Sequence, residues 1–499
     1  MSHLTGRVRL TGTGAAAQRL GRLVDAAAAC VERNIVPRDG RRVLRAGGGY
    51  PDPWTRDAAI NTWQAAAWLC PDVAADTLRA VCEPDGRTIA DDDQWWDQII
   101  WLVGAHQLAM VTGDASWARF GYDVGVATLR RLDERYLGPE GLYRGPAVMA
   151  DGITGYPPSL HDPGQPDASF ALDHAAVRHV RCLSTNATYV WALGCLAELG
   201  AVAGIDPAPW SSRAEALAGR VRNAFWIDAE HRFGYLLADG VLDGHQEGLG
   251  LALAILSGTA TPAQAEVTVA GAVRAPRGLP AVSPHFAGYD DDRPGRHGGA
   301  LWPMIMGVWA QAVAATGDRQ AFGTDLDLLL RLFDGPEPSF REVYHPVTGR
   351  PDGGWQTGRN WRSEPDQTWS AATLIGTVLY GLAGLRPAWD GLLCHPCVPP
   401  GLGDLELTVH WRGRPVTLSL SETAPSSATV DAAGTVHPSQ PSDLNHGDRY
   451  FGSAQVQAEP KYLSPPVQDA EAEPKYLSPM VQPEVDHSAQ PHVPGGGHA

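Results

Sequence analysis

Long runs in which alanine and leucine recur at i, i+3 and i+4 spacing dominate the sequence, and this spacing predicts amphipathic helices. Strand-like alternation is scarce over the first 388 residues. We therefore expect an all-α fold, with helices near residues 16–33, 57–70, 73–82, 94–112, 115–136, 184–204, 209–226, 246–257, 262–271, 300–316, 318–333 and 367–384.

Tight turns join these helices in pairs. Thr112-Gly113-Asp114 and Thr316-Gly317-Asp318 have the same composition, in which glycine ends one helix and aspartate starts the next. Ala203-Gly204-Ile205-Asp206 has a similar form. About a dozen helices arranged as antiparallel hairpins predict an (α/α)6 toroid, which we place over residues 1–390.

Two further regions follow the helices. Residues 405–411 and 415–421 alternate apolar and polar side chains around Arg412-Gly413-Arg414, which predicts a small β-hairpin element over 391–424. The only lysines, Lys461 and Lys475, lie in a repeated AEPKYLSP segment within a Pro/Glu-rich stretch. We expect residues 425–499 to be a disordered tail, with either a docking role for the repeat or none.

Charge and cysteine usage exclude several classes of protein. The 39 basic and 56 acidic residues give a net charge of −17, which argues against nucleic acid and anionic membranes as main partners. No apolar stretch reaches the length of a membrane span and no signal peptide is visible, so we expect a cytoplasmic protein. Its seven scattered cysteines are typical of reduced thiols.

No cofactor is expected, and no metal. The Cys394-His-Pro-Cys397 segment lacks a second ligand pair, and the acidic runs 91–93 and 290–292 lack the spacing of a calcium loop. Protein partners are left open.

The 17 tryptophans point to a carbohydrate ligand. Many of them stand beside Asp, Arg, His or Gln, and an apolar face with adjacent hydrogen-bonding groups suits a sugar ring. The alternative is a set of core tryptophans beside helix caps. The four clusters are Trp54–Asp57, Asp93–Asp97, His297–Trp302 and Asp366–Trp369.

Two carboxyl groups are candidates for catalysis. Asp151 lies in the long connection 137–183, among small and apolar residues that favour a protonated acid. Glu342 lies between a proline-rich and a glycine-rich stretch, as an anchored polar position. The alternatives are a turn-capping aspartate and a surface glutamate paired with Arg341. Residues 273–299 form a second long connection of the kind that carries function.

Six ordered segments over about residues 50–385 resemble the six-hairpin glycosidase superfamily, which includes glycogen-debranching (amylo-α-1,6-glucosidase-like) and other inverting α-glycosidases. A tryptophan that debranching relatives often place directly before the acid is Ala150 here. The segments are Tyr50–Asp57, Trp96–Trp101, Met149–Gly152, Ser184–Trp191, Arg296–Pro303 and Arg341–His345 with Gln367–Ser370.

The resemblance implies roles for individual residues. Asp151 would be the general acid and Glu342 the general base, separated by the space that an attacking water needs. The other implied residues would line the sugar site: Arg56, Asp57, Asp97, Gln98 and Arg144 as hydrogen-bonding partners, Trp54, Trp96, Trp302 and Trp369 as stacking walls, Arg296 in its helix-entry segment, and His297, His345 and Gln367 as orienting groups. Glu247 competes as the base or as a substrate ligand.

The predicted function is that of an inverting exo-glycoside hydrolase acting on a small α-linked glycoside. One alternative is a disaccharide phosphorylase, in which phosphate replaces the water and its base. Another is a carbohydrate-binding protein without activity.

Overall fold

The computed structural model describes residues 3–423, 428–431 and 434–438. The predicted tail from 439 onward, including both copies of the repeat, lies outside the described residues. The α-helices of the described part are α1 (Ala15–Arg33), α2 (Thr55–Asn61), α3 (Ala67–Leu69), α4 (Pro71–Ala80), α5 (Trp101–Thr112), α6 (Ala115–Tyr136), α7 (Leu183–Val202), α8 (Ala208–Phe225), α9 (Gly248–Leu256), α10 (Pro262–Gly271), α11 (Pro303–Thr316), α12 (Arg319–Phe333) and α13 (Thr368–Gly376).

Each predicted helix finds a counterpart in this set. The predicted runs 57–70 and 367–384 each continue into a π-helical segment, η1 (Thr62–Ala66) and η7 (Thr377–Leu382). Short 3₁₀ turns occupy the long connection before α7 and the start of α5. They are η2 (Gln98–Ile100), η3 (Ile153–Gly155), η4 (Pro158–Leu160), η5 (Ala171–Asp173) and η6 (Ala175–His179).

One helix starts later than the periodicity predicts. The expected helix at 94 begins only at Gln98, and the residues before it form turns. The indole N–H of Trp96 donates to the Ala147 carbonyl at 2.9 Å, so this turn is bonded to a loop far along the chain. A tertiary hydrogen bond therefore overrides local helix propensity at this point.

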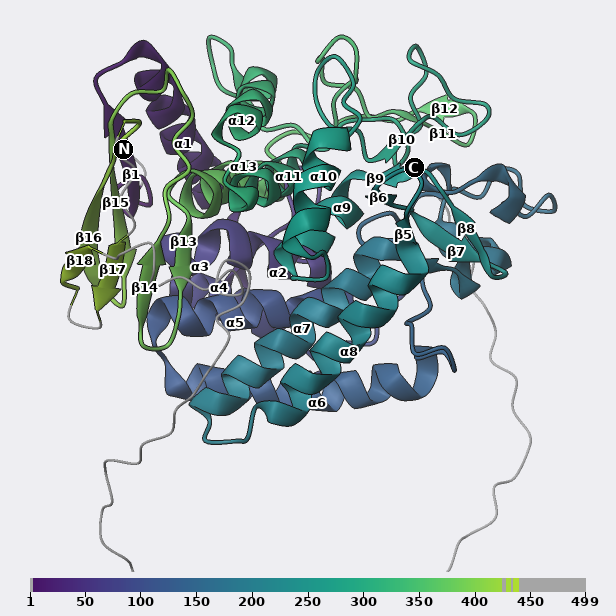
Figure 1. Ribbon diagram of the computed structural model, residues 1–499, viewed down its shortest axis with the longest axis horizontal. Helices are drawn as coiled ribbons and strands as arrows, with labels where there is room; N and C mark the ends of the chain where they lie inside the picture. Colours follow the sequence, from purple (N-terminus) through teal and green to yellow (C-terminus); the bar gives the residue numbers. More distant parts are fainter. Residues whose placement is uncertain (1–2, 424–427, 432–433, 439–499) are drawn as a thin grey trace, which may run out of the picture. The chain divides into compact units, whose positions relative to one another are not determined.

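The predicted turns between paired helices are confirmed. Gly113 and Gly317 end α5 and α11 in the left-handed conformation, at φ of 69° and 84°. Asp114 and Asp318 then accept backbone N–H groups from the first turns of α6 and α12. The pairs α5–α6, α7–α8 and α11–α12 pack against each other as antiparallel hairpins (Figure 1).

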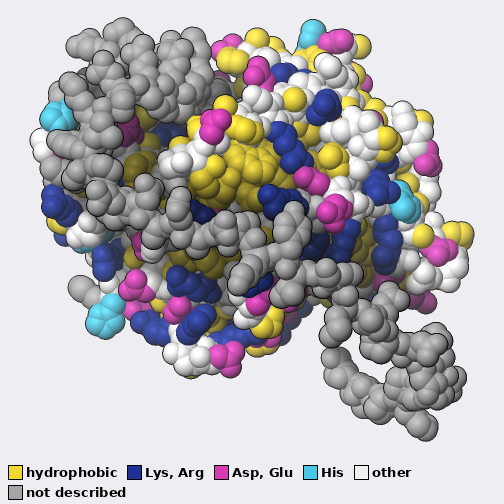
Figure 2. Space-filling view, turned by 90° about the horizontal axis from the view of Figure 1, so that it is seen from below, with side chains coloured by type: hydrophobic (Ala, Val, Ile, Leu, Met, Phe, Trp, Pro, Cys, Tyr) yellow, Lys and Arg dark blue, Asp and Glu magenta, His cyan; other side chains and the backbone are white. Residues whose placement is uncertain are grey.

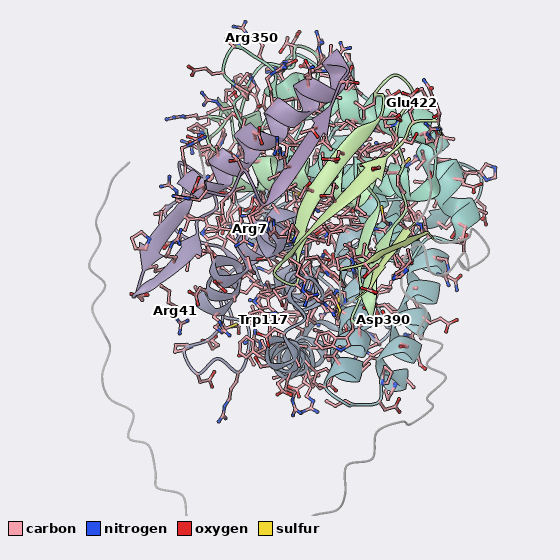
Figure 3. The ribbon with its side chains drawn as sticks, turned by 90° about the vertical axis from the view of Figure 1, so that its left-hand side faces the viewer. Arg7, Arg41, Trp117, Arg350, Asp390 and Glu422 are labelled. Carbon is pink, nitrogen blue, oxygen red and sulfur yellow. The ribbon has the colours of Figure 1, made fainter. Side chains whose placement is uncertain are left out.

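One sheet lies beside α1. The hairpin of β15 (Leu405–Trp411) and β16 (Arg414–Leu420) turns at Arg412 and Gly413, both with positive φ. The amino-terminal strand β1 (Val8–Gly12), which the sequence did not predict, pairs with β15 and completes a three-stranded sheet. Figure 3 shows this sheet beside α1, with Arg7 before β1 and Glu422 after β16.

The strands of the described residues form seven small sheets. They are β1 (Val8–Gly12) with β15 (Leu405–Trp411) and β16 (Arg414–Leu420); β2 (Ile35–Arg38) with β3 (Arg41–Leu44); β4 (Arg181–Cys182) with β7 (Leu236–Ala238) and β8 (Val241–Asp243); β5 (Trp226–Ile227) with β6 (Arg232–Phe233); β9 (Gln246–Glu247) with β10 (Val282–Ser283); β11 (Trp355–Gln356) with β12 (Arg359–Asn360); and β13 (Leu385–Pro387) with β14 (Gly391–Cys394), β17 (Ala428–Asp431) and β18 (Val436–Pro438).

Two groups of buried apolar side chains stabilise this arrangement. The larger group joins the helices to each other and to the β1–β15–β16 sheet. The smaller group lies under the long connections and includes Ala150, Tyr156, Cys182 and Tyr235. Loops of this length need a core of their own if they are to hold side chains in fixed positions, and the smaller group supplies it directly behind Asp151.

On the face seen in Figure 2, arginine and acidic side chains are interspersed around apolar patches. Among the described residues, no helix is long and apolar enough to span a bilayer. All seven cysteines fall in this part of the chain and are free thiols.

Candidate active site

The Asp151 carboxyl group lies at the centre of a polar cluster. Gln94 Nε2 donates to its Oδ2 at 3.2 Å, and an Arg56 nitrogen lies 3.8 Å from the same oxygen. Its side chain is 24% exposed, so the group is reachable from outside. Burial raises the pKa of Asp151, with Arg56 and Arg296 opposing and Glu342 adding to the rise. The site therefore favours the protonated form that a general acid needs.

Three consecutive side chains at the start of α7 hold the loop that leads to Asp151. Ser184 Oγ accepts the Val148 N–H at 2.9 Å, and Thr185 donates to the Pro146 carbonyl. Asn186 accepts the N–H of Tyr143 and donates to its carbonyl. These bonds fix the loop from Tyr143 to Asp151, called the acid loop below, against a rigid helix.

The residues next to Asp151 are held as firmly. The Tyr156 hydroxyl accepts the Ala147 N–H and donates to the Ala150 carbonyl at 2.7 Å. Met149 has a φ of 62°, a left-handed conformation that is rare for a residue with a side chain. Such strain persists only where the surroundings enforce it. The strained backbone at Met149 therefore orients Asp151, and the hydrogen bonds of the loop hold it in this conformation.

Arg56 links four polar groups at the floor of the cluster. It donates to Gln94 Oε1 at 2.7 Å and to Asp97 Oδ2 at 3.2 Å. Its guanidinium lies 3.7 Å from Asp57 Oδ2 and, as noted, 3.8 Å from Asp151. One buried cation thus serves three carboxyl groups and cannot neutralise all of them at once.

Burial, together with the excess of carboxyl groups over cations, raises the pKa values of two of these carboxyl groups. Burial raises the pKa of Asp57 to about 7, and Glu342, Asp97 and Asp151 add to the rise while Arg56 opposes it. Burial likewise raises the pKa of Asp97 to about 6. Asp57 Oδ2 is buried and accepts no hydrogen bond among the described residues, and the Arg56 guanidinium lies 3.7 Å from it.

Glu342 occupies the other side of the cluster. Arg296 donates to its Oε2 at 2.7 Å and the Tyr50 hydroxyl donates to its Oε1 at 2.9 Å. Its side chain is only 5% exposed, so the alternative of a surface glutamate paired with Arg341 is wrong. Charge-assisted hydrogen bonds to both oxygens stabilise a carboxylate, the form that a general base or anionic ligand requires.

The His297 ring is hydrogen-bonded to the backbone that follows Asp151. Nδ1 accepts the Gly152 N–H at 2.8 Å, so this nitrogen carries no proton and the 3.4 Å approach to Asp151 Oδ1 is not an ion pair. Burial and the nearby Arg296 and Arg56 charges lower its pKa well below the ordinary value. The ring is thus neutral and supports the backbone directly after the acid.

Four residues that the resemblance implied for the sugar site have side chains that are buried or bonded to other parts of the chain. Trp96 is 0% exposed and bonded to Ala147, so it supports the acid loop from behind. Gln98 uses its amide on Ala90, Asp92 and Arg131. The Arg144 guanidinium donates to the Arg135 carbonyl, and the His345 ring accepts the N–H groups of Val347 and Thr348 within its own turn.

The remaining aromatic candidates gather around the two arginines. Trp54 is 40% exposed, whereas Trp302 and Trp369 are buried and in edge contact with each other. Arg56 lies over the rings of Trp54 and Trp369, and Arg296 lies over Trp302. Of these tryptophans, Trp54 offers the largest exposed surface to a ligand, and the buried pair shapes the floor. Gln367 is buried beside Gly47, with its Oε1 unpartnered among the described residues.

Two residues of the cluster were missed by sequence reasoning. Gln94 joins Arg56 to Asp151, and Tyr50 binds Glu342. Both lie within segments quoted above, Asp93–Asp97 and Tyr50–Asp57. The site residues predicted from these segments were tryptophans and charged residues.

Glu247 is a further buried carboxyl group. It is 4% exposed, and its carboxyl bonds to Ser184 rather than to either arginine. Burial raises its pKa to about 8. It lines a small space together with Ala150 and His297.

Comparisons with known structures agree with a glycosidase fold. A structure described as a sialidase aligns with a TM-score of 0.67 at 16% identity, over 86% of this chain and 40% of its own length. The GH63 mannosylglycerate hydrolase of Thermus thermophilus in complex with glucose aligns with a TM-score of 0.53 at 17% identity, over 71% of this chain and 99% of that one. The GH78 rhamnosidase of Bacillus sp. GL1 aligns with a TM-score of 0.52 at 14% identity, over 85% and 40%.

Sequence comparison defines the family. No curated protein sequence matches the chain. The profile of the mannosylglycerate hydrolase MGH1-like glycoside hydrolase domain matches residues 50–370, well over half of the chain and the whole stretch from Tyr50 to the start of α13. This stretch contains every residue of the polar cluster, and the chain belongs to the MGH1-like glycoside hydrolase domain family.

Proposed function

We propose that this glycoside hydrolase is an inverting exo-enzyme on an (α/α)6 toroid, with a catalytic domain over 1–390, that cleaves a small α-linked glycoside. Asp151 protonates the glycosidic oxygen, and Glu342 removes a proton from the water that attacks the anomeric carbon. The observation that carries the proposal is the contrast between the two carboxyl groups within one cluster. Asp151 is desolvated and favours the acid form, while Glu342 is held by a cation and a hydroxyl.

Inversion requires one carboxylic acid and one carboxylate that act on opposite faces of the sugar ring. The different surroundings of Asp151 and Glu342 support these two roles. The exposed ring of Trp54 is the group we assign to the sugar itself.

The anchored Glu342 supports hydrolysis over phosphorolysis. A phosphorylase must admit a phosphate dianion where the hydrolase admits water, and a fixed carboxylate repels that anion. Arg296, the cation nearest to Glu342, is already bonded to it at 2.7 Å.

The family suggests which substrate to try first. Because the matching profile is named for mannosylglycerate hydrolase, mannosylglycerate leads the panel. It is followed by α-linked mannosides, glucosides, galactosides and rhamnosides.

Proton NMR of the first product, read before mutarotation, tests the proposal. A fresh β-anomer from an α-linked D-glycoside supports inversion, and an α-anomer contradicts it. Turnover that depends on added phosphate identifies a phosphorylase, and binding without turnover identifies a binding protein.

Variants at the two carboxyl groups complete the test. We expect Asp151→Asn and Glu342→Gln each to lower kcat by about 10²- to 10⁴-fold with little change in KM. Asp173→Asn, an exposed carboxyl in the connection after Asp151, is the matched control and should act as wild type. Activity within a few-fold of wild type in either site variant would refute the assignment.

A further inference from the structure

Glu247 is a buried carboxyl group that the mechanism above does not use. It ends β9 directly before α9, and Gly250 leaves the space that its Oε2 fills, since a Cβ there would lie 2.2 Å from this oxygen. The chain thus accommodates a carboxyl group in an apolar setting, which costs free energy unless the group is bonded or neutral.

The bonds of Glu247 lead to the acid loop in two steps. Its Oε2 accepts the Ser184 N–H at 3.1 Å, so the carboxyl holds the backbone at the start of α7. The Ser184 hydroxyl oxygen accepts the Val148 N–H at 2.9 Å. Glu247 therefore fixes Ser184, and Ser184 in turn holds the loop.

A small cavity brings Glu247 next to the residues that precede Asp151. It has a volume of about 10 Å³, room for one water at most. Glu247 and His297 line it together with Val148, Met149 and Ala150. The strained Met149 and the residue before Asp151 therefore form one wall of the space that Glu247 faces.

We propose that Glu247 is a positioning residue that fixes the acid loop through Ser184 and so holds Asp151 in line for proton transfer. This inference rests on the proposed function for its effect on catalysis. It replaces the earlier alternatives in which Glu247 is the base or a substrate ligand.

The surroundings of Glu247 favour its neutral form. The titratable groups that face it are Cys182 on β4, Tyr156 after η3, Tyr235 before β7 and His297 across the cavity, and none of them is cationic. Burial raises the pKa of Glu247 to about 8, so the carboxylic acid is the form present at neutral pH. Glutamine has the same shape and the same lack of charge.

Four variants test the proposal. Glu247→Ala and Ser184→Ala remove the two steps of the path, Glu247→Gln conserves the neutral form, and Glu266→Gln on the exposed face of α10 is the matched control. We expect the two alanine variants to lower kcat by about 10- to 100-fold with KM nearly unchanged, as a small misplacement of a catalytic group does. Glu247→Gln should keep at least about a third of the activity.

A second substrate separates positioning of the acid from general damage. The α-glycosyl fluoride of the same sugar has a leaving group that needs little protonation, so loss of acid catalysis affects it less. We expect the alanine variants to lose about 10-fold less on the fluoride than on the glycoside. Equal losses on both substrates, or a Glu247→Gln variant as inactive as Glu247→Ala, would overturn the proposal.

A third readout does not depend on turnover. Hydrogen exchange of the acid-loop backbone should be faster in Glu247→Ala and Ser184→Ala than in wild type and Glu266→Gln, because the Val148 N–H loses its fixed acceptor. If Glu247→Ala does not fold, Ser184→Ala and Glu247→Gln still decide the matter. Unchanged exchange in Ser184→Ala would overturn the proposal, whereas faster exchange in a protein without glycosidase activity would uphold the positioning and refute the proposed function alone.

Discussion

The Arg296 guanidinium donates to Glu342 at 2.7 Å while only 7% of its own side chain is exposed. Its second bond goes to the Gly353 carbonyl, and its face covers the Trp302 ring. The pair is therefore buried, bonded and packed, and a change in either partner leaves an unpaired charge in the site.

Removal of the cation tests this pair. We expect Arg296→Met to lower the free energy of unfolding by about 3–5 kcal/mol, because a buried carboxylate would lose its partner. Arg293→Met, in an ion pair whose side chains are 57% and 56% exposed, should change it by no more than about 0.5 kcal/mol. Urea unfolding of both variants measures the difference, and equal effects would contradict it.

The Tyr50 hydroxyl gives a milder test. Tyr50→Phe removes one hydrogen bond to a carboxylate, which typically contributes about 1.5–3 kcal/mol. We expect kcat/KM to fall about 10- to 100-fold and the thermal midpoint to fall by a few degrees. Tyr289→Phe is the control, since the described hydrogen bonds of Glu342 do not include Tyr289. A Tyr50→Phe enzyme with wild-type kcat/KM would show that this bond does not orient the base.

His297 should stay neutral over the physiological range. Its pKa is well below the ordinary value, so we expect its ring-nitrogen NMR shifts to be constant from about pH 5.5 to 8, with the proton on Nε2. The urea-unfolded protein, in which histidines titrate near pH 6.5, is the reference. A titration step in this range for the folded protein, absent from His297→Gln, would contradict the assignment.

Asp57 should make stability depend on pH. Its folded-state pKa of about 7 lies above the unfolded value near 3.8, so its contribution is complete below that value and is lost as the pH rises through 7. Relative to Asp57→Asn, wild type should lose up to about 1.4 kcal/mol of unfolding free energy per pH unit in that window. Asp52→Asn, whose carboxyl is 56% exposed and paired with Arg38, should run parallel to wild type. Parallel curves for Asp57→Asn as well would show that Asp57 is ionised throughout.

Local sequence was sufficient for the helices and their turns. Gly113 with Asp114, and Gly317 with Asp318, end and start helices through contacts within a few residues. Hydrogen bonds of this range depend only on neighbouring side chains, so periodicity and capping residues predict them. The segments that bear Asp151 and Glu342 were likewise recognisable as short motifs.

Only the tertiary structure decided which side chains meet. Tyr50 and Glu342 are 292 residues apart, and Glu247 and Ser184 are 63 apart, so no local pattern reports their contact. The same holds for Arg144 and His345, whose motifs are in place while their side chains bond to nearby backbone. Secondary structure follows from short-range bonds along the chain, whereas the site follows from how distant loops pack over the helices, and that packing depends on the whole core at once.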